Sequence, residues 1–124
     1  MYEDACWYAQ HAPVRQAVPG QLMLVAKRHF LDAAEMQPDE AHSLGNVLGK
    51  LTHALKDATG AERVYVVTVV ERTPHWHTWV IPRPADSETR GTAYLTSVLT
   101  GGFSTTEDEA TRVVGELKHS LEHA

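Results

Sequence analysis

The arrangement of apolar and polar positions in the first half of the chain predicts a strand followed by a long helix. A continuous apolar run covers residues 22–26 directly after the turn Pro19-Gly20, which is typical of a buried strand. From Pro38 to Gly60, apolar residues recur at the three- and four-residue spacing of a helix with one buried face. Pro38 suits the first turn of this helix and Gly60 its end.

The second half of the chain predicts two paired strands and a last helix. Residues 64–70 are rich in β-branched side chains, and residues 75–81 return to this composition after a short polar break. Strands joined so closely are expected to pair antiparallel. Hydroxyl and acidic residues at 104–109 precede a helical repeat of apolar residues that ends at Leu121. No secondary structure is assigned to residues 83–100.

Composition narrows the class of protein. The chain has 124 residues, which fits a single domain over residues 1–124, and its 43% hydrophobic content supports a packed core. A net charge of −5 without a basic block argues against nucleic-acid binding and favours a small ligand or a protein partner. The single Cys6 rules out an internal disulfide. No apolar stretch is long enough for a membrane helix and no export signal is visible, so we expect a cytoplasmic protein.

The candidate chemistry begins with two histidines two positions apart. In an extended strand, side chains alternate between faces, so His75, His77 and Trp79 point to the same side. Such a pair has three interpretations: polar residues on a wet sheet face, ligands for a metal ion, or a nucleophile with its helper. The spacing alone leaves all three open.

Two motifs in register resemble the histidine triad (HIT) superfamily. Residues His75–Arg83 are similar to the HIT signature His-x-His-x-His, two apolar residues and Pro-Arg, with Trp79 in place of the third histidine. Residues Pro19–His29 resemble the family's Pro-Gly-His strand and the basic turn after it. The resemblance covers residues 13–83 and implies an α+β fold: a HIT-like antiparallel sheet of about five strands with a main helix and a C-terminal helix.

The activity that this resemblance implies is that of a nucleotidyl hydrolase or transferase. His77 takes the place of the middle histidine, which attacks a phosphorus atom and forms a covalent intermediate. That reaction needs a neutral imidazole with one nitrogen free and the other held by an acceptor, commonly a backbone carbonyl. His75 matches the first triad histidine, which helps to orient the site. The resemblance further implies a nucleotide or phosphorylated small molecule as substrate, no required cofactor, and a homodimer built through a helix and an edge strand.

Departures from the family pattern affect substrate binding. Trp79 can donate a hydrogen bond but cannot deliver a proton to a leaving group, and Gln21 stands where many members have another histidine. The family's longer loop before the triad is reduced here to residues 71–74, in which Arg72 and Thr73 offer phosphate contacts. We therefore name Gln21, Trp79, Thr73 and Arg72 as substrate-binding candidates.

A structural zinc site is a further implication, because some bacterial HIT proteins bind zinc. Cys6, His29 and His75 match three of the four ligands, while the second cysteine position falls at Ala9. His11 is the candidate replacement for the fourth ligand.

Alternatives to a nucleotide-processing enzyme stay open. The chain could be a catalytically degenerate HIT-fold protein that binds nucleotide without turnover, or a metal-binding protein that uses His75 and His77. An enzyme that acts on a less usual phosphorylated substrate also fits the altered triad and the short loop.

Overall fold

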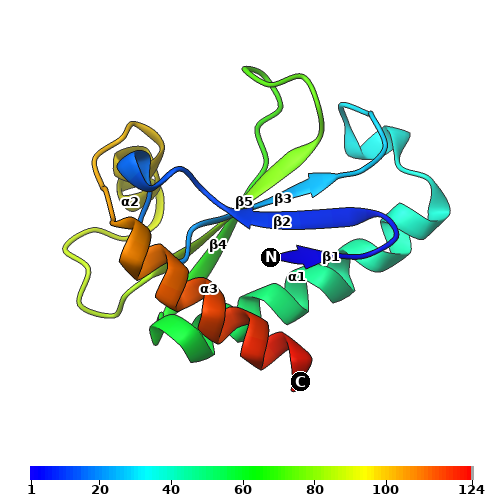
Figure 1. Ribbon diagram of the computed structural model, residues 1–124. Helices are drawn as coiled ribbons and strands as arrows, with labels where there is room; N and C mark the ends of the chain where they lie inside the picture. Colours follow the sequence, from blue (N-terminus) through cyan, green and yellow to red (C-terminus); the bar gives the residue numbers. More distant parts are fainter. Residues whose placement is uncertain (124) are drawn as a thin grey trace.

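The protein is built around one antiparallel sheet in the order β1-β2-β3-β5-β4 (Figure 1). The computed structural model describes residues 1–123. Its strands are β1 (Tyr2–Glu3), β2 (Trp7–His11), β3 (Leu22–Ala26), β4 (Arg63–Val67) and β5 (His77–Arg83), and its helices are α1 (Pro38–Thr59), α2 (Gly91–Leu99) and α3 (Glu107–Glu122). Short 3-10 turns cover Val14–Gln16 and Ala33–Glu35. This architecture confirms the predicted α+β class with a five-stranded sheet, a main helix and a C-terminal helix.

The predicted helices and the first predicted strand have the bounds that their sequence signals indicate. β3 coincides with the apolar run at 22–26, and α1 begins at Pro38. Gly60 ends α1 in the left-handed conformation, with a φ of 69° that a glycine adopts without strain. The α3 helix begins after Thr106, whose hydroxyl accepts a hydrogen bond from the Glu109 amide at 3.1 Å.

The predicted hairpin is confirmed as antiparallel, but its connection is longer than the sequence indicated. β4 and β5 pair with Val66 opposite Val80, yet β4 ends at Val67 and β5 begins only at His77. The amide of Trp76 donates to the carbonyl of Phe30 at 2.8 Å instead of joining the β4 ladder. Residues 68–76 therefore form a loop that rises from the sheet on the side away from α1 and α3 (Figure 1).

Helix α2 occupies part of the segment that received no assignment from the sequence. The Tyr65 hydroxyl accepts a hydrogen bond from the Gly91 amide at 2.8 Å, where the helix begins. The Tyr94 hydroxyl donates to the carbonyl of Pro82 at 2.8 Å. Both contacts join residues far apart in the chain, so tertiary interactions fix this helix to the sheet.

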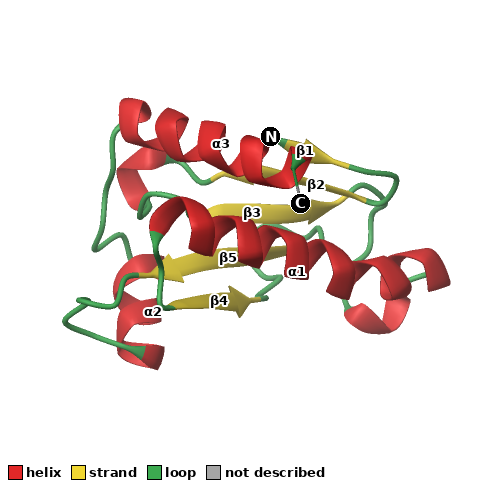
Figure 2. Ribbon diagram, turned by 90° about the horizontal axis from the view of Figure 1, so that it is seen from below, coloured by secondary structure: helices red, strands yellow, loops and turns green. Residues whose placement is uncertain are grey.

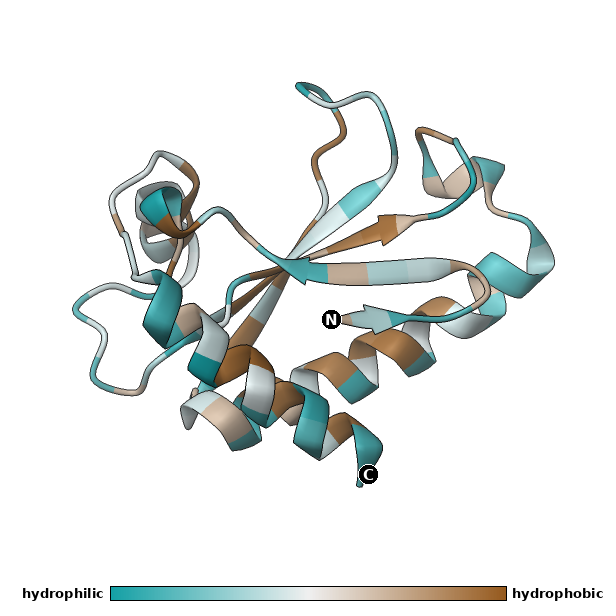
Figure 3. Cartoon of the chain, in the orientation of Figure 1, coloured by the Kyte–Doolittle hydropathy of each residue, from teal (hydrophilic) through white to brown (hydrophobic). Residues whose placement is uncertain are grey.

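The two faces of the sheet have different coverings. Helices α1 and α3 lie across one face (Figure 2), where Trp7, Leu24, Trp76 and Val80 belong to one buried cluster with residues of both helices. Figure 3 shows hydrophobic colour on α1 and α3 where the two helices approach each other. On the opposite face, α2 covers only the part of the sheet around Ile81. The remaining part of that face carries His77.

A glycine brings the turn before β3 close to the end of α1. Gly20 has a φ of 87°, and a Cβ atom there would lie 3.0 Å from the Thr59 side chain and 3.1 Å from Leu55. Only glycine fits without moving these neighbours. Among the residues that the structure describes, no helix combines the length and apolar character needed to cross a membrane.

Candidate functional site

His77 is the first residue of β5, and its imidazole has one nitrogen held and one nitrogen unengaged. Nδ1 lies 2.8 Å from the carbonyl oxygen of His75, and since a carbonyl can only accept, Nδ1 carries the proton. Within residues 1–123, Nε2 has no hydrogen-bond partner and so keeps its lone pair available. The residue is 8% exposed, so solvent reaches only a small part of it. This is the tautomer that a nucleophilic histidine requires.

His75 lies just before β5 and connects the loop to β3 and to the basic turn. Its Nε2 donates to the carbonyl of Ala26, the last residue of β3. Its Nδ1 lies 3.3 Å from Nδ1 of His29, and the two rings are 5.3 Å apart. Because Nε2 of a neutral His75 holds the proton, His29 donates and His75 accepts in this contact. The side chain of His75 thus fixes the backbone whose carbonyl holds His77.

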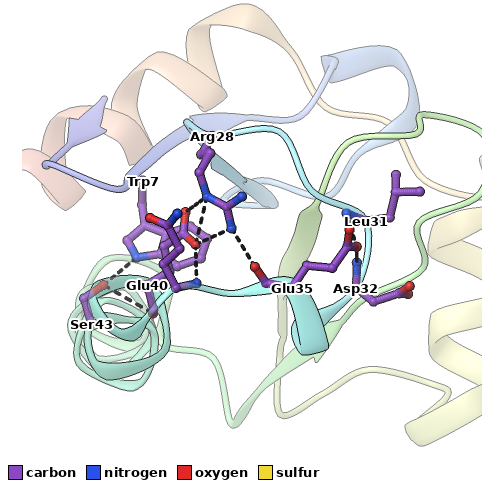
Figure 4. Close-up of polar contacts among 8 residues, drawn as sticks. Trp7, Arg28, Leu31, Asp32, Glu35, Glu40 and Ser43 are labelled. Atoms are coloured by element: carbon purple, nitrogen blue, oxygen red, sulfur yellow. Dashed lines mark hydrogen bonds and ion pairs between the residues drawn. The ribbon is translucent and has the colours of Figure 1, made fainter.

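The turn that carries His29 is anchored by a buried carboxylate (Figure 4). Glu40, in the first turn of α1, accepts hydrogen bonds from Nε and Nη2 of Arg28 and from the Gln37 amide at 2.8 Å. Arg28 also donates to the carbonyl of Glu35 at 2.7 Å. The hydrogen bonds from Arg28 keep the pKa of the Glu40 carboxyl below its usual value. This network ties the basic turn to the start of α1.

Neighbours of His77 follow from the strand register. Val25 of β3 lies opposite His77, and Met23 lies opposite Trp79. The rings of His77 and Trp79 are 6.3 Å apart with an interplanar angle of 89°, an edge-to-face contact. Tyr8 of β2, opposite Val25, adds an exposed aromatic ring to the same face. A ligand on this face would meet apolar and aromatic surface beside Nε2 of His77.

The other substrate-binding candidates have different surroundings. Gln21 is buried, and its Oε1 accepts from the Val18 amide at 3.2 Å, which stabilises the turn before β3. Gln21 lies four residues from Val25, the partner of His77, which corresponds to about 13 Å along a strand. Arg72 and Thr73 are exposed on the loop before His75. The structure therefore brings Trp79 next to His77 but does not bring Gln21 there.

Of the four predicted zinc ligands, only His29 and His75 lie together. His11 is at the far end of β2 from Cys6, where its Nδ1 donates to the Ala12 carbonyl and its Nε2 accepts from the Gly20 amide. Cys6 is half-buried against the core. Within residues 1–123, no group of three or more histidine, cysteine or carboxylate side chains has an arrangement that could hold a metal ion. The residues present do not fit a closed four-ligand zinc site.

Three cavities lie away from His77. One of about 560 Å³ extends from Pro82 to Phe103, and two others lie beside α1 and α3. His77 lines none of these three.

Strand order, helix placement and the position of His77 at the start of β5 define the class: the chain has the histidine triad fold. It superposes on a histidine triad protein from Bradyrhizobium japonicum with a TM-score of 0.77 at 14% identity, over 96% of this chain and 87% of that one. A hypothetical histidine triad nucleotide-binding protein from Sulfolobus tokodaii superposes with a TM-score of 0.73 at 18% sequence identity, over 98% of this chain and 82% of that one. A zinc-bound histidine triad family protein from Mycobacterium smegmatis superposes with a TM-score of 0.72 at 16% sequence identity, over 98% of this chain and 82% of that one. Neither protein-family models nor curated protein sequences give a match.

The structure also adds site residues that the sequence analysis did not name. Val25 and Tyr8 join the face of His77 through strand pairing, and Glu40 acts on the site through the turn that it anchors. Alternation of Trp7, Tyr8, Ala9 and Gln10 between buried and exposed positions was the available signal for β2.

Proposed function

We propose that this chain is a HIT-fold protein that binds a nucleotide or a nucleoside–phosphate conjugate and acts at its phosphorus atom through His77. The observation that carries the proposal is the hydrogen bond from Nδ1 of His77 to the His75 carbonyl at 2.8 Å. It leaves Nε2 as a bare nitrogen on a strand, whose position is rigid. A structural neighbour described as a nucleotide-binding protein supports the same ligand class.

The proposed reaction has two displacements. Nε2 of His77 attacks phosphorus, a P–N bond forms, and the bond to the leaving group breaks with its electron pair on that group. The His75 carbonyl accepts from Nδ1–H throughout and stabilises the positive charge that the imidazole gains. Water then attacks the same phosphorus and loses a proton to solvent, and the P–N bond breaks with its electron pair returning to Nε2. This releases the nucleoside monophosphate and leaves His77 neutral. If an alcohol attacks instead, the result is transfer.

Protonation of the leaving group is the step for which Trp79 offers no help. Its indole N–H donates a hydrogen bond but does not release its proton at neutral pH. We therefore expect good leaving groups, or groups that solvent protonates readily, to be the better substrates. A phosphoramidate or a phosphoanhydride fits this requirement.

The direct test is to trap the covalent intermediate. The protein is mixed with adenosine 5′-phosphoramidate or ADP, quenched, and examined by intact mass spectrometry for an added adenylyl group. The adduct is expected in the native chain and absent from His77→Ala. His53→Ala, which removes an exposed histidine of α1, is the matched control and should keep it. Absence of both adduct and turnover across a nucleotide panel would overturn the catalytic proposal.

Binding without turnover is the second candidate, favoured by the tryptophan at position 79. In that case calorimetry would detect AMP binding by the native chain while neither adduct nor product forms. His77→Ala would then change affinity for AMP without any activity to lose.

A metal ion held by paired imidazoles is a further candidate. A zinc ion here would replace the hydrogen bond between Nδ1 of His29 and Nδ1 of His75, and the proton of that bond would leave. The separation of 3.3 Å also suits two tetrahedral ligands at about 2.0–2.1 Å from the ion. A neighbouring structure is described as zinc-bound. Zinc titration followed by calorimetry, with His29→Ala and the exposed control His42→Ala, tests this candidate. Equal affinity in native chain and His29→Ala would remove it.

A homodimer is the proposed assembly. β4 is an edge strand of the described sheet, and Val66 in its middle is 47% exposed. An exposed apolar residue on a free strand edge suits pairing with a second copy. Sedimentation should show a dimer that Val66→Lys dissociates, while Leu31→Lys, at another exposed apolar residue, should not. A monomeric native chain would contradict this assembly.

A further inference from the structure

An apolar hollow lies at the end of the sheet opposite to His77. It measures about 560 Å³, a volume typical of small-molecule sites. Pro82 of β5, one of its lining residues, is five residues from His77, which corresponds to about 16 Å along a strand. The turn before β3, the end of α1, the loop after β5, α2 and the start of α3 all contribute walls. The hollow is therefore separate from the proposed catalytic face.

Aromatic and aliphatic side chains form the interior of this cavity. Tyr94 and Phe103 line it with their ring centroids 5.6 Å apart, and Val18, Pro82 and Val113 add aliphatic surface. Burial raises the pKa of Tyr94 to about 12, and its hydroxyl already donates to the Pro82 carbonyl, so the phenol stays neutral. The interior thus offers mainly apolar contact, and Phe103 is its more accessible aromatic side chain because Tyr94 is only 1% exposed.

Charged side chains of the cavity do not suit an anion. Glu88 and Glu109 carry negative charge, and Arg112 is the one cation among the lining residues. Arg112 is already engaged by both carboxylate oxygens of Glu109 and by Glu116 at 2.7 Å. Glu88 is exposed and has no hydrogen bond or ion pair recorded within residues 1–123. The lining is therefore net negative, and its guanidinium is neutralised.

We propose that this cavity is a second ligand site, which takes a small organic cation with an aromatic or aliphatic body. The ammonium group lies toward the exposed Glu88, and the apolar body packs against Phe103 and the aliphatic lining. Attraction of a cation to a free carboxylate supports this orientation. The site differs in charge preference from the phosphate-handling face of His77, so the two ligands bind independently.

A matched pair of probes tests the charge preference. 2-(1-Naphthyl)ethylamine is a cation at neutral pH, and 1-naphthylacetate is an anion with the same ring system. Calorimetry should show about tenfold tighter binding of the cation, because the net negative lining attracts it and repels the anion. Amide shifts in NMR should change at α2 and at the loop after β5, and AMP should not displace the cation.

Variants locate the site. Phe103→Ala and Phe103→Leu should both weaken cation binding, the first by about tenfold, because both remove the ring. The leucine variant retains apolar volume, and thermal melting of both variants verifies that they fold. Glu88→Gln should reduce the preference for the cation about threefold, whereas Glu71→Gln, on the loop before β5, should leave it unchanged.

The outcomes are decisive in both directions. Failure of both probes to bind, or shifts at α2 that persist unaltered in folded Phe103→Leu and Phe103→Ala, would overturn the site. Equal affinity for cation and anion would overturn the ligand class. Displacement of the cation by AMP would show that it binds the His77 face instead, which also contradicts the proposal.

Discussion

The two faces of the central sheet have different coverings, and β5 contributes alternate residues to each. Thr78 and Val80 are fully buried and face α1, whereas His77 and Trp79 face the side that α2 leaves partly open. One face is closed by two long helices and the other by a loop and a short helix. Neighbouring residues of one strand can therefore affect stability and chemistry separately.

Hydrogen bonds also connect the helix-covered side of the sheet to His77, the candidate nucleophile. His77 depends on the carbonyl of His75, whose own side chain is bonded to Ala26 and His29. The turn with His29 is in turn fixed by Glu40 of α1. The helix-covered side thus supports the open side through hydrogen bonds rather than through direct contact with the site.

The largest expected effect comes from the helix-covered face. Leu51, fully buried in α1, should lose about 3 kcal/mol of unfolding free energy on replacement by alanine, because a cavity opens in the main cluster. The melting temperature should fall by roughly 10 °C. Leu31→Ala, at an exposed leucine, should change it little. Equal losses in the two variants would contradict the contrast between buried and exposed positions.

The next effect tests the network between the faces and depends on pH. The lowered pKa of Glu40 means that its charged form stabilises the fold, and this contribution is lost as pH falls through the folded pKa. Glu40→Gln should therefore lower the melting temperature by roughly 5 °C at pH 7. The difference from the native chain should shrink as pH falls through the folded pKa of Glu40, since the native carboxyl then becomes neutral. Glu71→Gln serves as control. A difference in melting temperature between the native chain and Glu40→Gln that does not depend on pH would refute this account.

A smaller effect is expected at the start of α3. Thr106→Ala removes the hydroxyl that accepts from the Glu109 amide and should cost about 1 kcal/mol in chemical denaturation. Thr111→Ala, in the exposed middle of the same helix, should be neutral or slightly stabilising. An equal loss of stability in Thr106→Ala and Thr111→Ala would mean that the Thr106 hydroxyl does not stabilise the start of α3.

The smallest effect on stability is expected on the open face. Trp79→Phe keeps an aromatic ring beside His77 but removes the indole N–H, and it should change stability by less than about 1 kcal/mol. If the ring acts by packing alone, KM for adenosine 5′-phosphoramidate should stay within about threefold of the native value. A tenfold rise without loss of stability would instead identify the N–H as a donor to substrate.

Long periodic segments were predictable from the sequence, and tertiary details were not. The bounds of α1 and β3 followed from local signals, because their apolar patterns and end residues agree. Helix α2 was not predicted because its nine residues include a glycine, a serine and two threonines, which are weak helix formers. Its start depends on Tyr65, and Tyr94 within it is held by the Pro82 carbonyl. The early end of β4 depends on the contact between Trp76 and Phe30, which no local pattern reveals.

For the candidate site, the sequence indicated which face carries the imidazoles but not their partners. Alternation correctly grouped His77 with Trp79 and separated both from Val80. The pairing of His29 with His75 and the distance of His11 from them come from strand register, which a single sequence does not specify. Gln21 was chosen by motif position, whereas its buried side chain stabilises a turn.

The group that accepts from Nδ1 of His77 is a main-chain oxygen, and this has a consequence for substitutions around it. No replacement at position 75 removes the peptide carbonyl itself, so a side chain lost there changes the placement of the acceptor and not its presence. The proton on Nδ1 therefore has a partner whichever side chain stands at position 79.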